Sequence, residues 1–261
     1  MLLVIDIGNT NITIGAYLKD TLLDHFAVKT DTRTTADEFG ILLLSLLERS
    51  KVTASSIESA VISSVVPQMT GAVGRAIKKY LNTEPLILTI DMIKNFKVCC
   101  DNPQSLGMDR AVNVAAACEL YGAPLIVVDF GTATTFCAVV EGPKFIGGAI
   151  FPGMSTLVDA LASKAAKLPA VEIKKPKKVI GTDTITNIQS GIFYGYVELV
   201  DGMLRRTKDE MNSDRVKVIA SGGLADLIAD ECKQIDIVNK FLTLEGLRIV
   251  FEYNTKKVEE K

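Results

Sequence analysis

The sequence predicts an α/β fold with two similar domains that face each other across a cleft. Apolar strands alternate with helical stretches, and one motif occurs near the start of each half. In both copies an apolar strand ends in Asp, glycine follows two residues later, small polar side chains come next, and an apolar strand resumes. The copies span residues 2–15 and 125–140.

The first copy has the composition of a phosphate-binding loop. Gly8 lets the backbone approach a ligand, and Asn9, Thr10, Asn11 and Thr13 add small polar side chains beside exposed amides. Asp6 would repel phosphate directly, so its expected role is to hold Mg²⁺, with water between them if needed. Taken alone, the first copy is explained more simply by an ordinary hairpin with a turn-forming Asn. The second copy favours the loop hypothesis, because two such loops can grip one nucleotide from opposite sides.

The rest of the first half alternates helices and strands. Residues 35–38 have the pattern of a capping box, and Pro67 ends an apolar run. The expected elements are a strand at 26–29, a helix after the capping box that closes near 49–51, a strand at 60–66, a helix at 69–81 and a strand at 86–88.

An irregular segment at residues 98–110 separates the halves. Asn102-Pro103 breaks regular structure, Gly107 permits a turn, and Asp109-Arg110 begins a helix. Acids near a helix start are common for capping reasons, and the ordinary explanation of Arg110 is a surface cation. The sharper hypothesis is that Asp109 accepts a hydroxyl proton while Arg110 pairs with an anionic group of the same substrate.

The second half repeats the alternation. The expected elements after residue 140 are a strand at 144–146, a helix at 154–167, a basic connector at 174–178, a long helix at 185–211 and a strand at 216–220. Ser221-Gly222-Gly223 forms a turn that can lie flat against an adenosine. Gly191 and Gly195 indicate close packing of the long helix, within the chain or across a dimer interface. The expected domains are 1–117 and 118–254, with a charged tail at 255–261.

Composition excludes several classes of protein. A net charge of −2 gives no electrostatic case for a nucleic-acid partner, and the apolar runs are too short to span a bilayer. No leader segment precedes the first strand, so a cytoplasmic location is expected. Five cysteines without a CxxC pair favour reduced thiols. His25, the one histidine, is expected at the surface and excludes a multi-histidine metal site.

Taken together, these segments resemble the type III pantothenate kinase family, a branch of the acetate-kinase, sugar-kinase, Hsp70 and actin superfamily. The Leu-Gly-x-Asp-Arg block between the two phosphate motifs is the most specific part. The resemblance spans nearly the whole chain and is carried, in the family's order, by residues 6–10, 102–103 with 106–110, 129–133, 147–148 with 152–153, Gly181 with Thr184, and 221–223. It implies two actin-like (ribonuclease H-like) domains with a nucleotide cleft between them.

The resemblance also implies an activity and the residues that perform it. ATP would phosphorylate pantothenate to 4′-phosphopantothenate, the first step of coenzyme A biosynthesis, with Asp109 as the general base. Asp129 would hold the monovalent cation, K⁺ or NH₄⁺, that the family uses beside Mg²⁺, and the protein would be a homodimer with substrate sites completed near the interface. The implied ATP contacts are Asp6, Ile7, Gly8, Asn9, Thr10, Asn11, Ile12, Thr13 and Thr132; the implied substrate contacts are Cys100, Gly107, Met108, Asp109, Arg110 and Thr184.

One departure and two alternatives accompany this hypothesis. Family members often carry an aromatic residue where this chain has Cys100, and a smaller thiol changes the substrate pocket. A catalytically silent, ATP-binding regulatory protein of the same fold would show damage at Asp6, Asp109 or Asp129, and all three are present. A kinase for a sugar or another small acid is the second alternative, although Arg110 favours an anionic acceptor.

Overall fold

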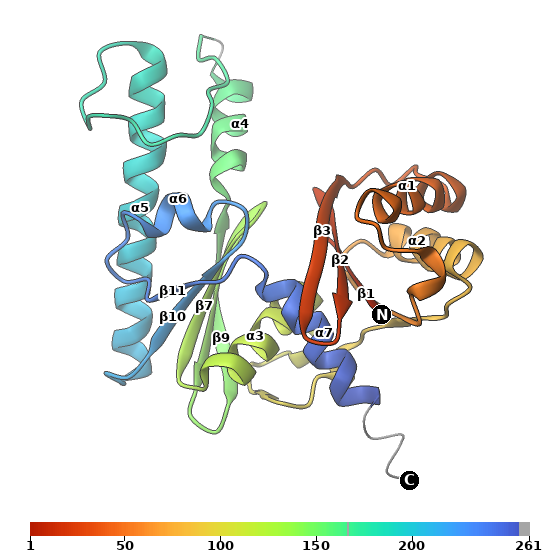
Figure 1. Cartoon of the computed structure of the whole chain (residues 1–261). Helices are drawn as coiled ribbons and strands as arrows, with labels where there is room; N and C mark the ends of the chain where they lie inside the picture. The colour runs from red at the N-terminus through yellow and green to blue at the C-terminus, as the bar shows by residue number, and fades with distance from the viewer. Residues whose placement is uncertain (166, 256–261) are drawn as a thin grey trace. The chain divides into compact units, whose positions relative to one another are not determined.

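The structure is a computed structural model that describes residues 1–165 and 167–255 (Figure 1). Its contacts divide the chain into two compact units, each built on its own sheet. Unit 1 holds Met1–Asn95, Asn102–Ala116 and the C-terminal segment from Leu242. Unit 2 holds Phe96–Asp101 and Ala117–Phe241.

The sheet of unit 1 has the strand order β3-β2-β1-β4-β5. The first three strands pair antiparallel, whereas β4 runs parallel to β1 and β5 runs parallel to β4. The antiparallel strands are joined by short turns. The parallel strands need longer connections, and these connections contain helices. The strands are β1 (Leu2–Ile7), β2 (Asn11–Leu18), β3 (Thr21–Lys29), β4 (Ser59–Ser64) and β5 (Pro85–Ile87).

Alternate residues of β1 enter opposite layers. Leu3, Ile5 and Ile7 are fully buried in a core with α1 (Ala36–Arg49) and α2 (Pro67–Leu81). The opposite face of the sheet packs against α7 (Leu242–Thr255), which contacts β1, β2 and β4. This helix is not among the elements expected from the sequence.

Local signals set the helix starts of unit 1. Thr35 caps α1 with the expected capping box: its hydroxyl accepts from the Glu38 N–H at 3.3 Å, and its own N–H donates to the Glu38 carboxylate at 2.8 Å. Pro67 occupies the first turn of α2, where its missing N–H costs nothing. The strand expected at 26–29 extends back to Thr21 as β3.

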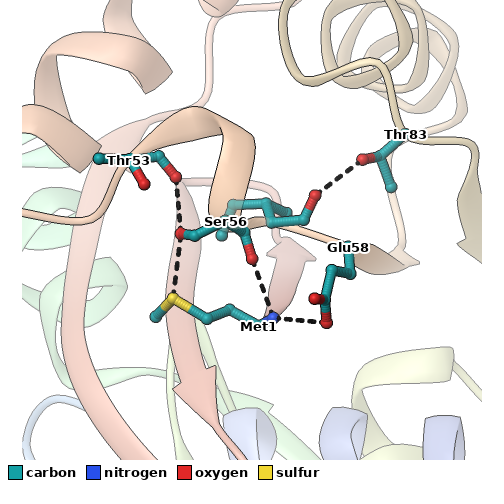
Figure 2. Close-up of polar contacts among 6 residues, drawn as sticks. Met1, Thr53, Ser56, Glu58 and Thr83 are labelled. Carbon is teal, nitrogen blue, oxygen red and sulfur yellow. Dashed lines mark hydrogen bonds and ion pairs between the residues drawn. The ribbon is translucent and has the colours of Figure 1, made fainter.

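The start of β1 is fixed by polar contacts (Figure 2). The α-amino group of Met1 donates to the Ser56 carbonyl at 2.9 Å and to the Glu58 carboxylate at 3.0 Å. The Ser56 hydroxyl in turn contacts the Met1 sulfur at 3.1 Å. The Thr83 hydroxyl donates to the carbonyl of residue 57 at 3.1 Å. These contacts hold the segment before β4 against β1, the strand that carries Asp6.

The sheet of unit 2 repeats this arrangement. Its order is β11-β10-β7-β8-β9-β6, in which β9-β8-β7-β10-β11 reproduces β3-β2-β1-β4-β5 in strand direction. The repeated sequence motif therefore corresponds to a repeated topology. The strands are β6 (Lys97–Val98), β7 (Leu125–Phe130), β8 (Ala133–Val140), β9 (Lys144–Pro152), β10 (Lys217–Ser221) and β11 (Ile237–Val238).

Helices α4 (Met154–Lys164) and α5 (Thr184–Met211) contact each other in unit 2 (Figure 1). Phe193, Tyr196 and Val200 of α5 are buried in the core that the even-numbered residues of β7 form. The short α6 (Ala225–Ala229) follows β10. The strand expected at 144–146 continues to Pro152 as β9, and the helix expected to end at 167 ends at Lys164.

The division of the chain differs from the expected domains in two places: residues 96–101, expected in the first domain, belong to unit 2, and α7, expected in the second, belongs to unit 1. One boundary between the two units falls inside α3 (Met108–Tyr121), after Ala116. Helix α7, in contrast, belongs to unit 1 although it follows unit 2 in the sequence. The reason is close packing: a Cβ added at Gly246 would lie 2.4 Å from the Val112 carbonyl oxygen of α3. Of the tail expected at 255–261, only Thr255 lies within the described residues.

No helix of the described part of the chain is long and apolar enough to cross a membrane. His25 is exposed. The five cysteines are free thiols, and their exposure differs: Cys137 and Cys232 are buried, whereas Cys99 is exposed.

Candidate active site

The loop after β1 is held from β3. The Gly8 N–H donates to the Asn11 carbonyl at 3.0 Å, the Thr30 hydroxyl to the Gly8 carbonyl at 2.7 Å and the Thr30 N–H to the Thr10 carbonyl at 2.9 Å. Asn9, Thr10 and Asn11 remain exposed at its tip. A short polar loop is thus presented where β1 ends, and hydrogen bonds from Thr30 hold its backbone in place.

The strand residues that flank the loop face different layers. Ile7 and Ile12 pair across the hairpin and are at most 1% exposed, so a ligand can reach only their backbone. Asp6 pairs with Thr13 of β2 and, in parallel register, with Ser63 of β4. Register neighbours point to the same face, so Thr13, Asp6 and Ser63 form a polar row across three strands.

The loop after β7 is clamped by the start of α4. The Thr132 carbonyl accepts from the Gly153 N–H at 2.9 Å and from the Thr156 hydroxyl at 2.8 Å. A Cβ at Gly153 would lie 2.2 Å from the Gly131 carbonyl oxygen, so this contact requires glycine. The Thr132 residue itself is exposed.

A second polar row flanks Asp129. Asp129 pairs with Thr135 of β8 and, in parallel register, with Ser221 of β10. Gly222 follows with φ +93°, and a Cβ there would lie 2.7 Å from the Asp129 Oδ1 atom. The expected Ser-Gly-Gly turn therefore lies directly against the Asp129 carboxylate.

Ser63 and Ser221 are not among the site residues expected from the sequence, although both belong to these rows. The sequence offers only a weak signal: Ser63 lies in the middle of the apolar strand candidate at 60–66, and Ser221 directly follows the candidate at 216–220. Only the register shows that both serines lie beside the two motif aspartates.

Asp109 is the second residue of α3, at the helix start that the sequence predicts. Its Oδ1 atom accepts from the Arg110 N–H at 2.8 Å, and a Cβ at Gly107 would lie 2.5 Å from that same oxygen. Gly107, Met108, Asp109 and Arg110 are all half-buried. The Asp109 carboxylate therefore packs against Gly107, and a larger side chain at position 107 would displace this carboxylate.

The remaining candidate residues lie in unit 2. Cys100 is half-buried just after β6. Thr184 begins α5, is exposed, and lines a hollow of about 500 Å³ between α4 and α5. Residues 6–13 and 107–110 belong to unit 1, whereas Cys100, Asp129, Thr132 and Thr184 belong to unit 2.

Cation binding at the two aspartates needs oxygen atoms from other groups. Among residues 1–165 and 167–255, no group of three or more His, Cys, Asp or Glu side chains lies close enough to hold a metal ion. Hard cations such as Mg²⁺ and K⁺ accept carboxylate, hydroxyl, carbonyl, water and phosphate oxygens. A lone Asp flanked by hydroxyls fits a cation that a bound nucleotide helps to coordinate.

Comparison with known proteins decides the family. A sequence model described as type III pantothenate kinase matches residues 2–206. The chain belongs to the type III pantothenate kinase family. It is also 46% identical over 254 residues to the type III pantothenate kinase of Halalkalibacterium halodurans, across 97% of this chain and 100% of that protein. The family inferred from the sequence motifs is thus confirmed.

Solved structures share the fold at low sequence identity. A candidate 2-dehydro-3-deoxygalactonokinase from Sinorhizobium meliloti aligns with a TM-score of 0.60 at 15% identity, over 99% of this chain and 97% of that chain. A candidate Baf family transcriptional activator from Campylobacter jejuni aligns with a TM-score of 0.59 at 18% identity, over 97% and 99%. These likenesses concern the fold alone, and they confirm the actin-like α/β class. The nucleotide cleft between domains stays a prediction of the sequence.

Proposed function

We propose that this type III pantothenate kinase family member uses ATP to phosphorylate pantothenate to 4′-phosphopantothenate, the first step of coenzyme A biosynthesis. Family membership over most of the chain, with Asp6, Asp109 and Asp129 all present, is the observation that carries the proposal. A silent regulatory protein of this fold would be expected to have lost one of these carboxylates.

ATP is proposed to bind residues 6–13 and Thr132. The exposed tip at Asn9 and Thr10 and the rigid anchoring of the loop by Thr30 support phosphate binding there. Asp6 holds Mg²⁺, directly or through water, and Asp129 holds K⁺ or NH₄⁺. When bound, these cations offset the negative charge of the phosphates.

Asp109 is proposed as the general base. Pantothenate offers a primary hydroxyl and a carboxylate; the hydroxyl oxygen attacks the γ-phosphorus, ADP leaves, and the hydroxyl proton passes to Asp109. Arg110 is the neighbouring cation suited to the pantothenate carboxylate. The position of Asp109 at the start of α3, with its carboxylate fixed over Gly107, supports the role because a base must be held in one place.

Gly107, Met108, Cys100 and Thr184 complete the proposed substrate contacts. Cys99 offers an internal control for Cys100, since it is an adjacent and exposed thiol. Pantothenate should slow the alkylation of Cys100 by iodoacetamide and leave that of Cys99 unchanged, as measured by peptide mass spectrometry. Equal protection of both thiols, or of neither, would remove Cys100 from the pocket.

A homodimer in the cytoplasm completes the proposal, as the family resemblance implies. Sedimentation velocity should give twice the chain's mass of 28.2 kDa. A purely monomeric and active enzyme would contradict the dimer.

The deciding experiment is phosphorylation of pantothenate by the purified protein with ATP and Mg²⁺, comparing K⁺, NH₄⁺ and Na⁺. Product with K⁺ or NH₄⁺ and little with Na⁺ supports the kinase and its cation. Asp109→Asn should reduce kcat by at least about 100-fold, the range for loss of a general base, whereas Glu119→Gln on the exposed end of the same helix should not.

Two results would redirect the assignment. Product from another small acid but not from pantothenate would favour the alternative kinase. A folded protein that binds ATP and phosphorylates none of the acceptors tested would favour the regulatory alternative.

A further inference from the structure

Two fully buried serine hydroxyls occupy equivalent places in the two units. Ser63 is 0% exposed in β4, and Ser221 is 1% exposed in β10. Neither hydroxyl oxygen has a hydrogen-bond partner among residues 1–165 and 167–255. Buried polar atoms are nearly always paired, so an unpaired one calls for a physical explanation.

Both serines lie beside a motif aspartate. Ser63 is the parallel register neighbour of Asp6, and Ser221 is that of Asp129. Adjacent strands are about 4.8 Å apart, and register neighbours point to the same face of the sheet. Rotation about one side-chain bond therefore brings each hydroxyl toward its neighbouring carboxylate.

The core on the other face cannot satisfy these hydroxyls. Ile5, Ile7 and Ile62 enter the apolar layer under α1 and α2, so Asp6 and Ser63, which alternate with them, face the opposite side. In unit 2, Val128 and Ala220 enter the core under α5, so Asp129 and Ser221 face away from it. The acceptor next to each serine on its own face is thus the aspartate.

The same arrangement in both units argues against accident. A buried hydroxyl without a partner destabilises the fold, and alanine would fill nearly the same volume without that cost. Such a residue is typical of a binding site that trades stability for function. The group that it serves is the neighbouring carboxylate, to which the sequence already assigns a cation.

We propose that Ser63 and Ser221 are positioning residues for Asp6 and Asp129. In the nucleotide-loaded kinase each hydroxyl donates a hydrogen bond to its aspartate and fixes the orientation in which that carboxylate faces the cation. The inference deepens the proposed function, on which it rests, and it predicts a division of labour: Ser63 supports the Mg²⁺ dependence and Ser221 the K⁺ dependence.

Ser63→Ala and Ser221→Ala test this division, each serving as the other's control. Ser221→Ala should raise the K⁺ concentration for half-maximal activity about tenfold, as expected for a lost hydrogen bond to a charged group. Its Mg²⁺ requirement should stay within about twofold of wild type. Ser63→Ala should show the reverse.

Thermal unfolding supplies a readout independent of catalysis. Without ligands, both variants should melt at or above the wild-type temperature, because each loses an unpaired buried hydroxyl. With MgADP present, KCl in place of NaCl should raise the melting temperature of wild type and Ser63→Ala, and the same KCl concentration should raise that of Ser221→Ala by much less. Ser64→Ala is the matched control: its hydroxyl already bonds the Val66 backbone, so its loss should lower stability and leave both cation responses intact.

Three results would overturn the inference. They are unchanged cation responses in both variants, equal changes in both responses in either variant, and ligand-free melting temperatures lowered as in Ser64→Ala. A wild-type enzyme that ignores pantothenate would refute the proposed function instead, while the melting responses to K⁺ and Mg²⁺ would still test the serines.

Discussion

Gly222 gives the sharpest test of how the turn after β10 packs against Asp129 at the end of β7. Its φ of +93° strains any L side chain, and a Cβ would lie 2.6 Å from the Phe130 carbonyl oxygen and 2.7 Å from the Asp129 Oδ1 atom. Strain at such a φ costs about 1–3 kcal/mol, and an overpacked contact with backbone adds about 1–3 kcal/mol. Gly222→Ala should therefore lose about 2–6 kcal/mol of stability and displace the Asp129 carboxylate.

The assay is thermal unfolding with the K⁺ dependence of activity measured in parallel. At about 2–4 °C per kcal/mol for a chain of this size, the melting temperature should fall by at least about 4 °C. Gly223→Ala is the matched control, since a Cβ at this neighbouring glycine meets no atom of the described residues within 4 Å. Equal melting temperatures for Gly222→Ala and wild type, or equal losses in both variants, would refute the contact and strain argument.

Three further predictions concern other parts of the chain. Gly246→Ala should lower the free energy of unfolding by about 1–3 kcal/mol, because its Cβ would lie 2.4 Å from the Val112 carbonyl oxygen. Gly202→Ala should raise it by about 0.5–1 kcal/mol, because a Cβ there meets no atom of the described residues within 4 Å. Chemical denaturation measures both changes. The Ser50 hydroxyl lowers the pKa of Asp24 below its ordinary 3.8, so this hydrogen bond stabilises the fold at pH 7 and ceases to do so as pH falls through the lowered pKa. Ser50→Ala should therefore be less stable than wild type at pH 7, and the difference between the two should vanish at low pH. A constant difference in stability down to pH 2 would contradict this. Burial raises the pKa of the Cys118 and Cys232 thiols to about 12, so iodoacetamide at pH 8 should label Cys99 before either, and early labelling of Cys232 would contradict its burial.

Much of the chain's local structure follows from its sequence. The capping box at Thr35, the proline at the start of α2 and the glycine turns after Asp6 and Asp129 act through hydrogen bonds and backbone preferences that span only a few residues. The motif repeat also indicated the repeated topology, because each copy sets a strand, a turn and a second strand in the same order.

The full length of β9 and the packing of α7 were harder to predict from the sequence. The strand expected at 144–146 is longer in the structure, because pairing with β8 carries β9 on through Gly147 and Gly148 to Pro152. Helix α7 went unpredicted, and its place in unit 1 depends on contacts with strands far away in sequence. Such contacts depend on packing that no local pattern encodes.

The candidate site divides in the same way. The sequence by itself determined which residues are the candidates for the chemistry, since Asp6, Asp109 and Asp129 each stand in a recognisable local pattern. The tertiary structure alone decided their neighbours: Ser63 lies 57 residues from Asp6 and Ser221 lies 92 residues from Asp129, yet strand register makes each pair adjacent. Register depends on how whole strands pack in a sheet, and a single residue's type carries too little information to fix it.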